Sequence, residues 1–272
     1  MADFRLFTSI RYDPILLDAP KQEDLNATEW NRQTASPWYM LDYHRDRMLK
    51  AAVHFGWGSA AARLAGPEGL QRLDAFLAPF AQSAVSAVHR VKITIDGEGQ
   101  LAYESGPASQ TGLRNLFPAR LPARAEDESA ADLPRRQPEF EVYVDSAPTS
   151  QTEFTHHKTT RRQMYDDARR RYALSPPDAK EVLLVNPRDG SIMEGSITTP
   201  FFWRNGRWVT PPVPKVFQEG EGSGGNDGTT RRWALERGLA IEEVILADSL
   251  VDGEECWISN GVRGFIFGRI KR

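Results

Sequence analysis

The sequence predicts an α+β fold in which most strands pair antiparallel, and two observations lead to this prediction. Of the 272 residues, 40% are hydrophobic and 26% are charged, which is typical of a globular chain long enough for one large or two small domains. Alternating apolar segments are joined by short turns, such as Asp-Gly-Glu-Gly at 96–99 and Asn-Gly at 205–206, more often than by helices. Hairpins of this kind build antiparallel sheets.

The N-terminal segments predict one strand followed by two helices. Residues 4–12 alternate apolar and polar side chains, which predicts a half-buried strand. Residues 18–37 are rich in proline, asparagine and other polar residues, which predicts an irregular insertion. A helix is expected from Leu41 until Gly56, the first helix breaker, and a second over 68–88, where large apolar residues recur on one face.

A hairpin and a long loop are expected next. Residues 91–95 alternate as a strand, and 100–103 can pair back after the turn. Residues 105–138 carry prolines, alanines and mixed charges without periodicity, which predicts a surface loop. Residues 140–144 predict another strand.

The segment Ser-Ala-Pro-Thr-Ser at 146–150 has the composition of a linker. We therefore expect an N-terminal α+β domain over 1–145, a linker over 146–152 and a C-terminal domain over 153–272. In the C-terminal half, helices are expected over 164–172 and from Thr229 to Arg237. The expected strands cover residues 182–185, 191–193, 201–203, 208–210, 243–246, 256–259 and 265–270.

Charge and cysteine content argue against several classes of protein. The 34 basic and 37 acidic residues give a formal charge of −3, which provides no general attraction to nucleic acid or anionic membrane. This balance disfavours a binding module built on the arginines at 161–162 and 169–171. Cys256 is the single cysteine, so an intrachain disulfide and a cysteine-rich zinc site are both excluded.

The apolar pattern bears on location. No run of 18 apolar residues predicts a transmembrane helix, and residues 1–5 lack the pattern of a secretory signal. We expect a cytoplasmic protein with neither a membrane nor a nucleic-acid partner.

Two segments contain residues that can act chemically, and each also has an ordinary structural explanation. Lys158 follows two histidines and precedes two threonines, and a lysine with a lowered pKa can attack a carbonyl carbon. The alternative for Lys158 is a solvent-exposed, basic start of a helix. The two histidines lack a suitably spaced acidic or cysteine partner, so no metal site is expected. Glu194 precedes Gly195 after a strand and faces either a ligand or water.

Two later segments suit anionic groups. Residues 224–231 lead from a glycine-rich turn into a helix, whose free N–H groups can bind a phosphate. This segment has neither the lysine of a Walker loop nor a dinucleotide fingerprint, and the alternative is a flexible loop with a capped helix. Arg263 lies between glycines at 259–264, where a guanidinium can bind a carboxylate through two hydrogen bonds. The alternative for Arg263 is a surface turn.

Taken together, these motifs resemble a known family. The order of His-Arg-Asp-Arg at 44–47, Lys-Thr-Thr-Arg-Arg at 158–162, Met-Glu-Gly at 193–195, Gly-Thr-Thr-Arg at 228–231 and Asn-Gly-Val-Arg at 260–263 is similar to that of class IV, fold type IV pyridoxal-phosphate enzymes. That family includes branched-chain and D-amino-acid aminotransferases and 4-amino-4-deoxychorismate lyases. The resemblance implies a small N-terminal α/β domain, a larger C-terminal pseudo-barrel domain and a homodimer.

The resemblance also implies roles for single residues. Lys158 matches the lysine that holds pyridoxal 5'-phosphate as a Schiff base, and Glu194 matches the carboxylate at the pyridine nitrogen. Arg47 matches the arginine that binds the cofactor phosphate. Arg263 is implied to bind the substrate. The other implied cofactor contacts are Gly228, Thr229, Thr230, Asn260 and Gly261.

The resemblance leaves two activities open for a small-molecule amine substrate. The Asn260-x-x-Arg263 spacing and the short start at Phe4 favour a 4-amino-4-deoxychorismate lyase, which releases pyruvate and 4-aminobenzoate through Schiff-base chemistry. The alternative is an aminotransferase of the same fold that acts on D-amino acids or (R)-amines with an α-keto acid acceptor. Thr199 and Gly261 depart from the aminotransferase pattern, in which many relatives carry an asparagine and a hydroxyl residue respectively.

Overall fold

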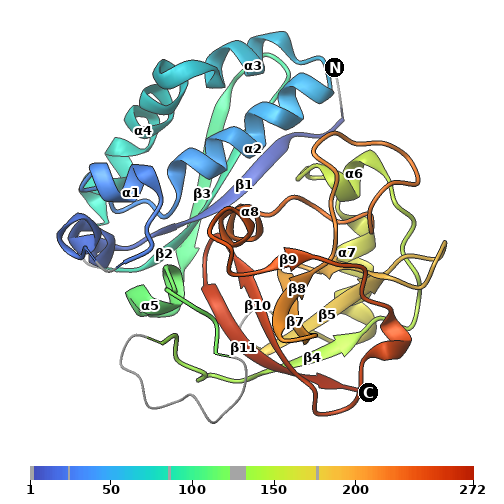
Figure 1. Cartoon of the computed structure of the whole chain (residues 1–272). Coiled ribbons are helices and arrows are strands. Elements are labelled where there is room, and N and C mark those ends of the chain that lie inside the picture. Colours follow the sequence, from blue (N-terminus) through green and yellow to red (C-terminus); the bar gives the residue numbers. More distant parts are fainter. Residues whose placement is uncertain (1–2, 24, 85–86, 123–132, 176–177) are drawn as a thin grey trace. The chain divides into compact units, whose positions relative to one another are not determined.

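The chain is divided into two compact units. The computed structural model describes residues 3–23, 25–84, 87–122, 133–175 and 178–272. Unit 1 comprises Met1–Phe117, His157–Arg161 and Gly261–Arg263, and unit 2 comprises Pro118–His156, Arg162–Asn260 and Gly264–Arg272. Figure 1 colours the elements of both units along the chain. Two short segments of the C-terminal half, at 157–161 and 261–263, thus belong to the unit built mainly from the N-terminal half.

Unit 1 contains a three-stranded antiparallel sheet. Its strands lie in the order β1 (Leu6–Tyr12), β2 (His89–Ile95) and β3 (Leu101–Pro107). The expected first strand and the hairpin after it are confirmed, and the register places Leu6 opposite Ile95. The expectation that the first strand is half-buried is wrong, because Thr8 and Arg11 are buried as well as the apolar residues. Side chains alternate across the strands, so Leu6, Ile10 and Ile93 are fully buried in the core of the unit.

Helices complete the core of unit 1. The helical elements are η1 (Pro14–Lys21), α1 (Glu29–Gln33), α2 (Leu41–His54), α3 (Gly58–Leu64), α4 (Gly66–Ser83) and α5 (Leu113–Leu116). α2 packs on β1, and Met48 and Leu73 join the same apolar cluster as the strands. The helices expected from Leu41 and over 68–88 are confirmed, although the second begins and ends earlier.

The expectation of an irregular insertion at 18–37 is wrong for much of that segment. η1 and α1 form there because each has a capping side chain: Asp13 accepts a hydrogen bond from Ile15 N, and Thr28 accepts one from Asn31 N. The loop expected at 105–138 is likewise shortened by the end of β3 and by α5, and residues 123–132 lie outside the described part of the chain.

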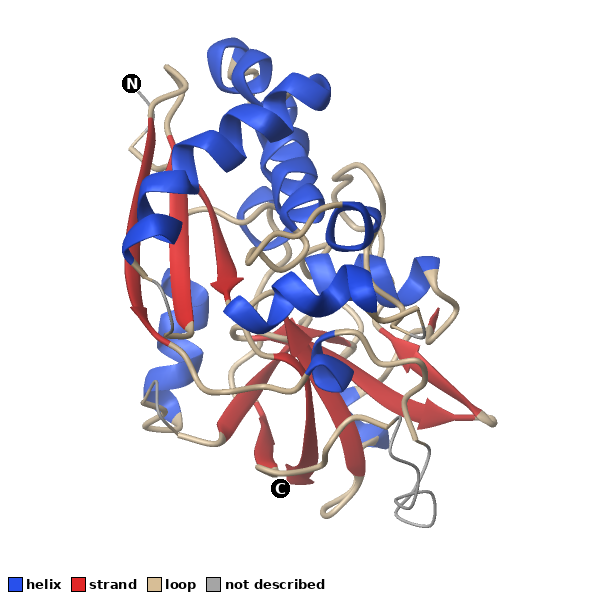
Figure 2. Cartoon of the chain, turned by 90° about the vertical axis from the view of Figure 1, so that its left-hand side faces the viewer, coloured by secondary structure: helices blue, strands red, loops and turns tan. Residues whose placement is uncertain are grey.

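Unit 2 is built around an eight-stranded mixed sheet with the order β6-β5-β4-β11-β10-β7-β8-β9. Figure 2 shows these strands fanning out as a strongly twisted sheet. The strands are β4 (Phe140–Val144), β5 (Lys180–Val185), β6 (Ile192–Gly195), β7 (Thr199–Arg204), β8 (Arg207–Thr210), β9 (Ile241–Glu242), β10 (Glu255–Asn260) and β11 (Gly264–Lys271). The helical elements are α6 (Glu153–His156), α7 (Gln163–Arg171), α8 (Thr229–Glu236) and η3 (Ala247–Ser249).

Most pairings in this sheet are antiparallel, as expected. The Asn-Gly hairpin between β7 and β8 is confirmed, because Asn205 and Gly206 both adopt positive φ, at 50° and 80°. The strand expected at 243–246 is wrong. Glu243 N and Ile192 N each make a single backbone bond there, to Thr210 O and Ile245 O, and no ladder continues beyond β9 in the described residues.

The unit boundary falls at Phe117, whereas the sequence predicts a domain boundary near 146–152. β4 belongs to unit 2 because it pairs in parallel with β5 and with β11. The domain limits of 1–145 and 153–272 stay a prediction. Across the described residues, no helix is long and apolar enough to span a membrane, and no three His, Cys, Asp or Glu side chains gather as a metal site.

Candidate active site

The predicted site residues are distributed over both compact units. Unit 1 contains Arg47, Lys158, Gly261 and Arg263, and unit 2 contains Glu194, Gly228, Thr229, Thr230 and Asn260. Each unit therefore carries a polar cluster of its own.

Lys158 lies on an extended segment along the edge of β1. Its carbonyl oxygen accepts a hydrogen bond from Phe7 N at 3.0 Å, and Thr159 forms an antiparallel bridge with Leu6. The Lys158 Nζ lies 5.0 Å from the centroid of the Phe7 ring. The segment is not a solvated helix start, because α6 ends at His156 and α7 begins at Gln163. Lys158 is half-buried and its backbone is fixed by the sheet.

Arg47 joins a buried polar chain in the same unit. Its guanidinium donates to Thr8 Oγ1, and the Thr8 hydroxyl lies 2.6 Å from His44 Nδ1. Thr8 and His44 are both completely buried. Burial holds the pKa of His44 well below its ordinary value, and the charges of Arg47 and Lys158 lower it further. A neutral imidazole next to two cations leaves net positive charge in this cluster, which suits a phosphate.

The 261–263 turn docks on the same edge of β1 as the lysine segment. Arg11 N donates to Gly261 O at 3.0 Å, just as Phe7 N donates to Lys158 O. The Arg11 guanidinium donates to Val262 O, also at 3.0 Å. One strand thus places Lys158, Gly261 and Arg263, although the chain separates them widely.

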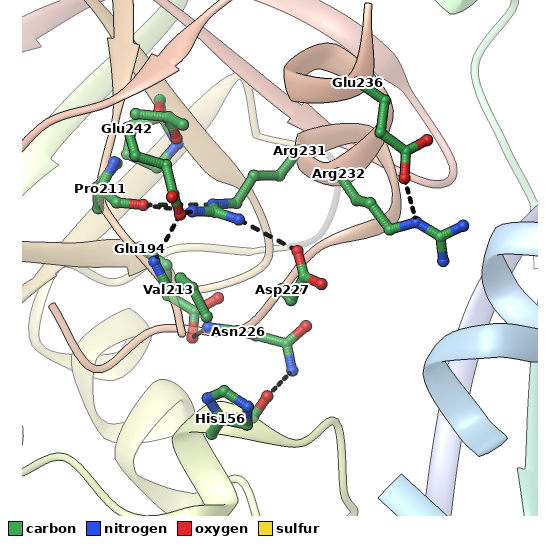
Figure 3. A network of polar contacts seen from close by, with 12 residues as sticks. His156, Glu194, Pro211, Val213, Asn226, Asp227, Arg231, Arg232, Glu236 and Glu242 are labelled. Carbon is green, nitrogen blue, oxygen red and sulfur yellow. Dashed lines mark hydrogen bonds and ion pairs between the residues drawn. The ribbon is translucent and has the colours of Figure 1, made fainter. Parts of the chain in front are cut away.

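Glu194 in unit 2 is a buried carboxylate with defined donors. Its Oε1 accepts a hydrogen bond from the Tyr165 hydroxyl at 2.5 Å and one from Asn226 N at 3.1 Å. The Asn226 side chain donates in turn to His156 O at 2.7 Å, as Figure 3 shows. Burial, followed by the Glu194 charge, raises the pKa of Tyr165 well above its ordinary value, so the phenol remains a donor.

Glycines let the 224–228 segment approach β6. A Cβ on Gly225 would lie only 2.5 Å from Met193 O, and one on Gly224, which has φ +95°, would lie 2.9 Å from Met193 Cε. The glycine-rich composition therefore serves close packing that brings Asn226 N to Glu194.

The start of α8 has the features of an anion-binding site. Gly228 is the N-cap, and no side chain among the described residues caps the first turn. Thr229 is 3% exposed, and its Oγ1 has no hydrogen-bond partner in the described structure. Thr230 Oγ1 instead lies 2.7 Å from Ser259 Oγ. A helix N-terminus with an unused, buried hydroxyl fits the oxygens of a phosphate.

Asn260 contacts the turn that follows Glu194. Its Nδ2 donates to Ile197 O at 3.2 Å. The fully buried Glu181 holds this turn by accepting hydrogen bonds from Ser196 Oγ at 2.5 Å and Thr198 Oγ1 at 2.8 Å. The Asn260 side chain thus has a structural partner, and its contact to a cofactor stays a prediction.

Sequence reasoning missed several polar residues around the site. It gave no role to Arg11, to Thr8 or to Tyr165. It placed Arg231 in a motif but did not predict its buried ion pairs with Asp227 at 3.1 Å and with Glu242. One sequence signal pointed to these ion pairs. Arg231 directly follows Thr229 and Thr230 at the start of a predicted helix, and an arginine that becomes buried needs polar partners.

Comparisons with known proteins identify the family of the chain. A family model described as amino-transferase class IV matches residues 29–269. The aminodeoxychorismate lyase of Saccharomyces cerevisiae is 34% identical over 148 residues, which cover 48% of this chain and 37% of the yeast protein. The matched part thus spans well under half of that relative's length.

Solved structures share the fold over nearly the whole chain. A Mesorhizobium loti protein, provisionally named an amino-acid aminotransferase, matches with a TM-score of 0.67 and 23% identity, covering 99% of this chain and 100% of that one. The 4-amino-4-deoxychorismate lyase of Pseudomonas aeruginosa matches with a TM-score of 0.58 and 16% identity, covering 98% and 82%. The two-domain α+β fold of type IV is therefore confirmed. With the family model covering most of its length, the chain belongs to the class IV aminotransferase family.

Proposed function

We propose that this enzyme is a pyridoxal 5'-phosphate-dependent 4-amino-4-deoxychorismate lyase that releases pyruvate and 4-aminobenzoate. The observation that carries the proposal is that the chain, which is similar to a lyase of that name, contains both an edge-fixed lysine, Lys158, in unit 1 and a buried carboxylate, Glu194, in unit 2. The 34% identity to the yeast lyase favours the lyase reaction over transamination.

The residues present fit the cofactor. In unit 1, Arg47 would supply a cation for its phosphate, and in unit 2 the start of α8 at Gly228 and Thr229 would supply donors. The unpartnered Thr229 hydroxyl supports the assignment of α8 within the described structure. Glu194 would hold the pyridine nitrogen, and Lys158 would hold the aldehyde carbon. When bound, pyridoxal 5'-phosphate withdraws electrons from the substrate carbon next to the amine.

The protein's own groups have separate tasks in this proposal. The Lys158 amine takes the proton from that carbon and can return it. Glu194 keeps a proton on the ring nitrogen, and the donors at its Oε1 from Tyr165 and Asn226 fix the carboxylate in place. Arg263 binds a substrate carboxylate through two charge-assisted hydrogen bonds.

The test compares two lysines that share one aromatic ring. Lys158→Ala should remove the visible absorbance band of the bound cofactor and all formation of 4-aminobenzoate and pyruvate. Lys92→Ala is the matched control, because Lys92 Nζ lies 5.5 Å from the centroid of the same Phe7 ring and pairs with Glu104 at 3.3 Å. It should retain both the band and the activity.

Each outcome has a separate meaning. Product formation by Lys158→Ala would exclude this lysine from the mechanism. A wild-type protein that binds the cofactor, forms no 4-aminobenzoate and converts a D-amino acid or (R)-amine with an α-keto acid would be an aminotransferase. A protein that does not bind pyridoxal 5'-phosphate would overturn the whole proposal.

A further inference from the structure

Arg11 is an unusual residue in the core of unit 1. It lies on β1 and its side chain is 0% exposed, whereas arginines are rarely buried completely unless they are paired. Asp13 supplies the pair: its Oδ2 accepts a hydrogen bond from Arg11 Nε at 2.8 Å and lies 2.6 Å from the NH2 nitrogen. A buried ion pair of this kind contributes little to stability compared with apolar packing, so its presence calls for another explanation.

The third nitrogen of the Arg11 guanidinium, NH1, indicates what the Arg11–Asp13 pair does. Arg11 NH1 donates to two backbone carbonyls, Ser109 O at 2.9 Å and Val262 O at 3.0 Å. The Arg11 backbone adds a third tie, from its N–H to Gly261 O at 3.0 Å. One residue therefore binds two successive carbonyl groups of the 261–263 turn.

A planar guanidinium is needed for this arrangement. It can pair with a carboxylate along one edge and donate to carbonyl groups from another nitrogen, whereas a lysine ammonium is a single point with three donors. Asp13 is itself fixed, because its Oδ1 accepts a hydrogen bond from Ile15 N at 3.1 Å as the cap of η1. The chain of contacts thus runs from a capped helix through a buried ion pair to the turn.

We propose that the Arg11–Asp13 pair positions the 261–263 turn and thereby sets the affinity of the enzyme for substrates that carry a carboxylate. Arg263 directly follows Val262, whose carbonyl Arg11 holds. A displaced Arg263 guanidinium makes poorer charge-assisted hydrogen bonds to a substrate carboxylate, because such bonds weaken steeply when distance and angle depart from their ideal values. Arg11 is a positioning residue, since no part of its side chain is exposed to a substrate. The proposal has two parts. The affinity part, the effect on binding of carboxylated substrates, rests on the proposed role of Arg263, whereas the positioning part, the fixing of the 261–263 turn by Arg11 and Asp13, does not.

The variants are chosen so that the fold survives. Arg11→Met alone leaves the Asp13 charge buried, so the main variant is the double change Arg11→Met with Asp13→Asn, which removes both charges and keeps an oxygen to cap η1. Arg11→Lys tests the need for the planar group. Arg136→Met is the control, because it removes a mostly buried ion pair to Glu255, at 3.0 Å, from the end of β10 opposite Asn260.

Two measurements decide the matter, and the first is independent of cofactor and activity. Hydrogen exchange of the 261–263 amides should be about tenfold faster or more in the double variant and in Arg11→Lys, and unchanged in Arg136→Met. Unchanged exchange in the double variant would overturn the positioning role.

The second measurement is steady-state kinetics well below the melting temperature of each variant. KM for a carboxylated amine should rise about tenfold or more, with kcat within about twofold, and kinetics with an amine lacking a carboxylate should be unchanged. Equal losses with both substrates, or losses that Arg136→Met reproduces, would show a structural role only and overturn the affinity part. Absence of turnover in the wild type would refute the proposed function and this affinity part with it, while the exchange result would still decide the positioning part.

Discussion

Replacing Tyr165 with phenylalanine tests the buried carboxylate of unit 2 without any cofactor. The substitution removes one oxygen and keeps the ring, so it leaves almost no cavity. The oxygen donates to Glu194 Oε1 at 2.5 Å and lies 3.3 Å from Thr155 O, and Glu194 is only 9% exposed. Loss of a hydrogen bond to a charged, buried acceptor costs about 1.5–3 kcal/mol. The free energy of unfolding should fall by that amount at neutral pH.

A second phenol–carboxylate pair in the same unit provides the control. The Tyr143 hydroxyl donates to Glu141 Oε2 at 2.8 Å, but the Glu141 side chain is 43% exposed. Water can replace this bond, so Tyr143→Phe should cost less than about 1 kcal/mol.

Urea denaturation of the cofactor-free protein gives both values. Equal losses for the two variants, or no loss for Tyr165→Phe, would refute the reasoning that Tyr165 stabilises a buried Glu194 carboxylate. In the loaded enzyme, Tyr165→Phe should also lower kcat more than it raises KM, because it loosens the group proposed to hold the ring nitrogen.

Three further predictions concern unit 1 and assembly. Arg263→Ala should bind pyridoxal 5'-phosphate normally but lose about 30- to 1,000-fold in kcat/KM for carboxylated substrates, and loss of the cofactor instead would make Arg263 a phosphate ligand. Because the folded protein keeps His44 neutral, its stability should fall as pH drops below 6.5, where the unfolded chain gains the proton. His44→Gln should remove that component, at most about 1.4 kcal/mol per pH unit, as measured by urea denaturation across this range, and an unchanged pH slope would contradict the assignment. The active enzyme should sediment as a homodimer, and an active monomer would contradict the resemblance on this point.

Local sequence patterns predicted the elements that follow a regular period. β1, β2 and the β7–β8 hairpin were visible because alternation and an Asn-Gly turn are local properties. The segment at 243–246 is also rich in β-branched and apolar residues, yet its residues make single bonds and no ladder, since a strand needs a partner and local composition does not show one. The parallel pairing of β4 with β11, which joins Phe140 to Gly268, was beyond sequence reasoning for the same reason.

The residues of the candidate site also fall into two groups, those that a local motif identifies and those that only the fold reveals. Lys158, Glu194 and Thr229 were identifiable because each stands in a short motif with a resemblance to a family. Tyr165 was not, because its partner Glu194 is 29 residues away and a tyrosine on a charged helix has no special pattern. Arg11 is 251 residues from Val262, and only the fold shows that it is buried.

One edge of β1 binds two motifs that are far apart in the sequence. β1 pairs with β2 on one edge, and its other edge accepts the lysine segment at Phe7 and the 261–263 turn at Arg11. Phe7 and Arg11 are four residues apart on a strand, so their N–H groups point to the same side. This strand therefore fixes the backbones of two separate segments of chain, one that carries Lys158 and one that carries Arg263. Both segments interrupt the sequence of unit 2. The segments at 157–161 and 261–263 are too short and too polar to show the alternation of a strand. Sequence reasoning therefore identified them by their motifs and did not predict that they lie along a sheet.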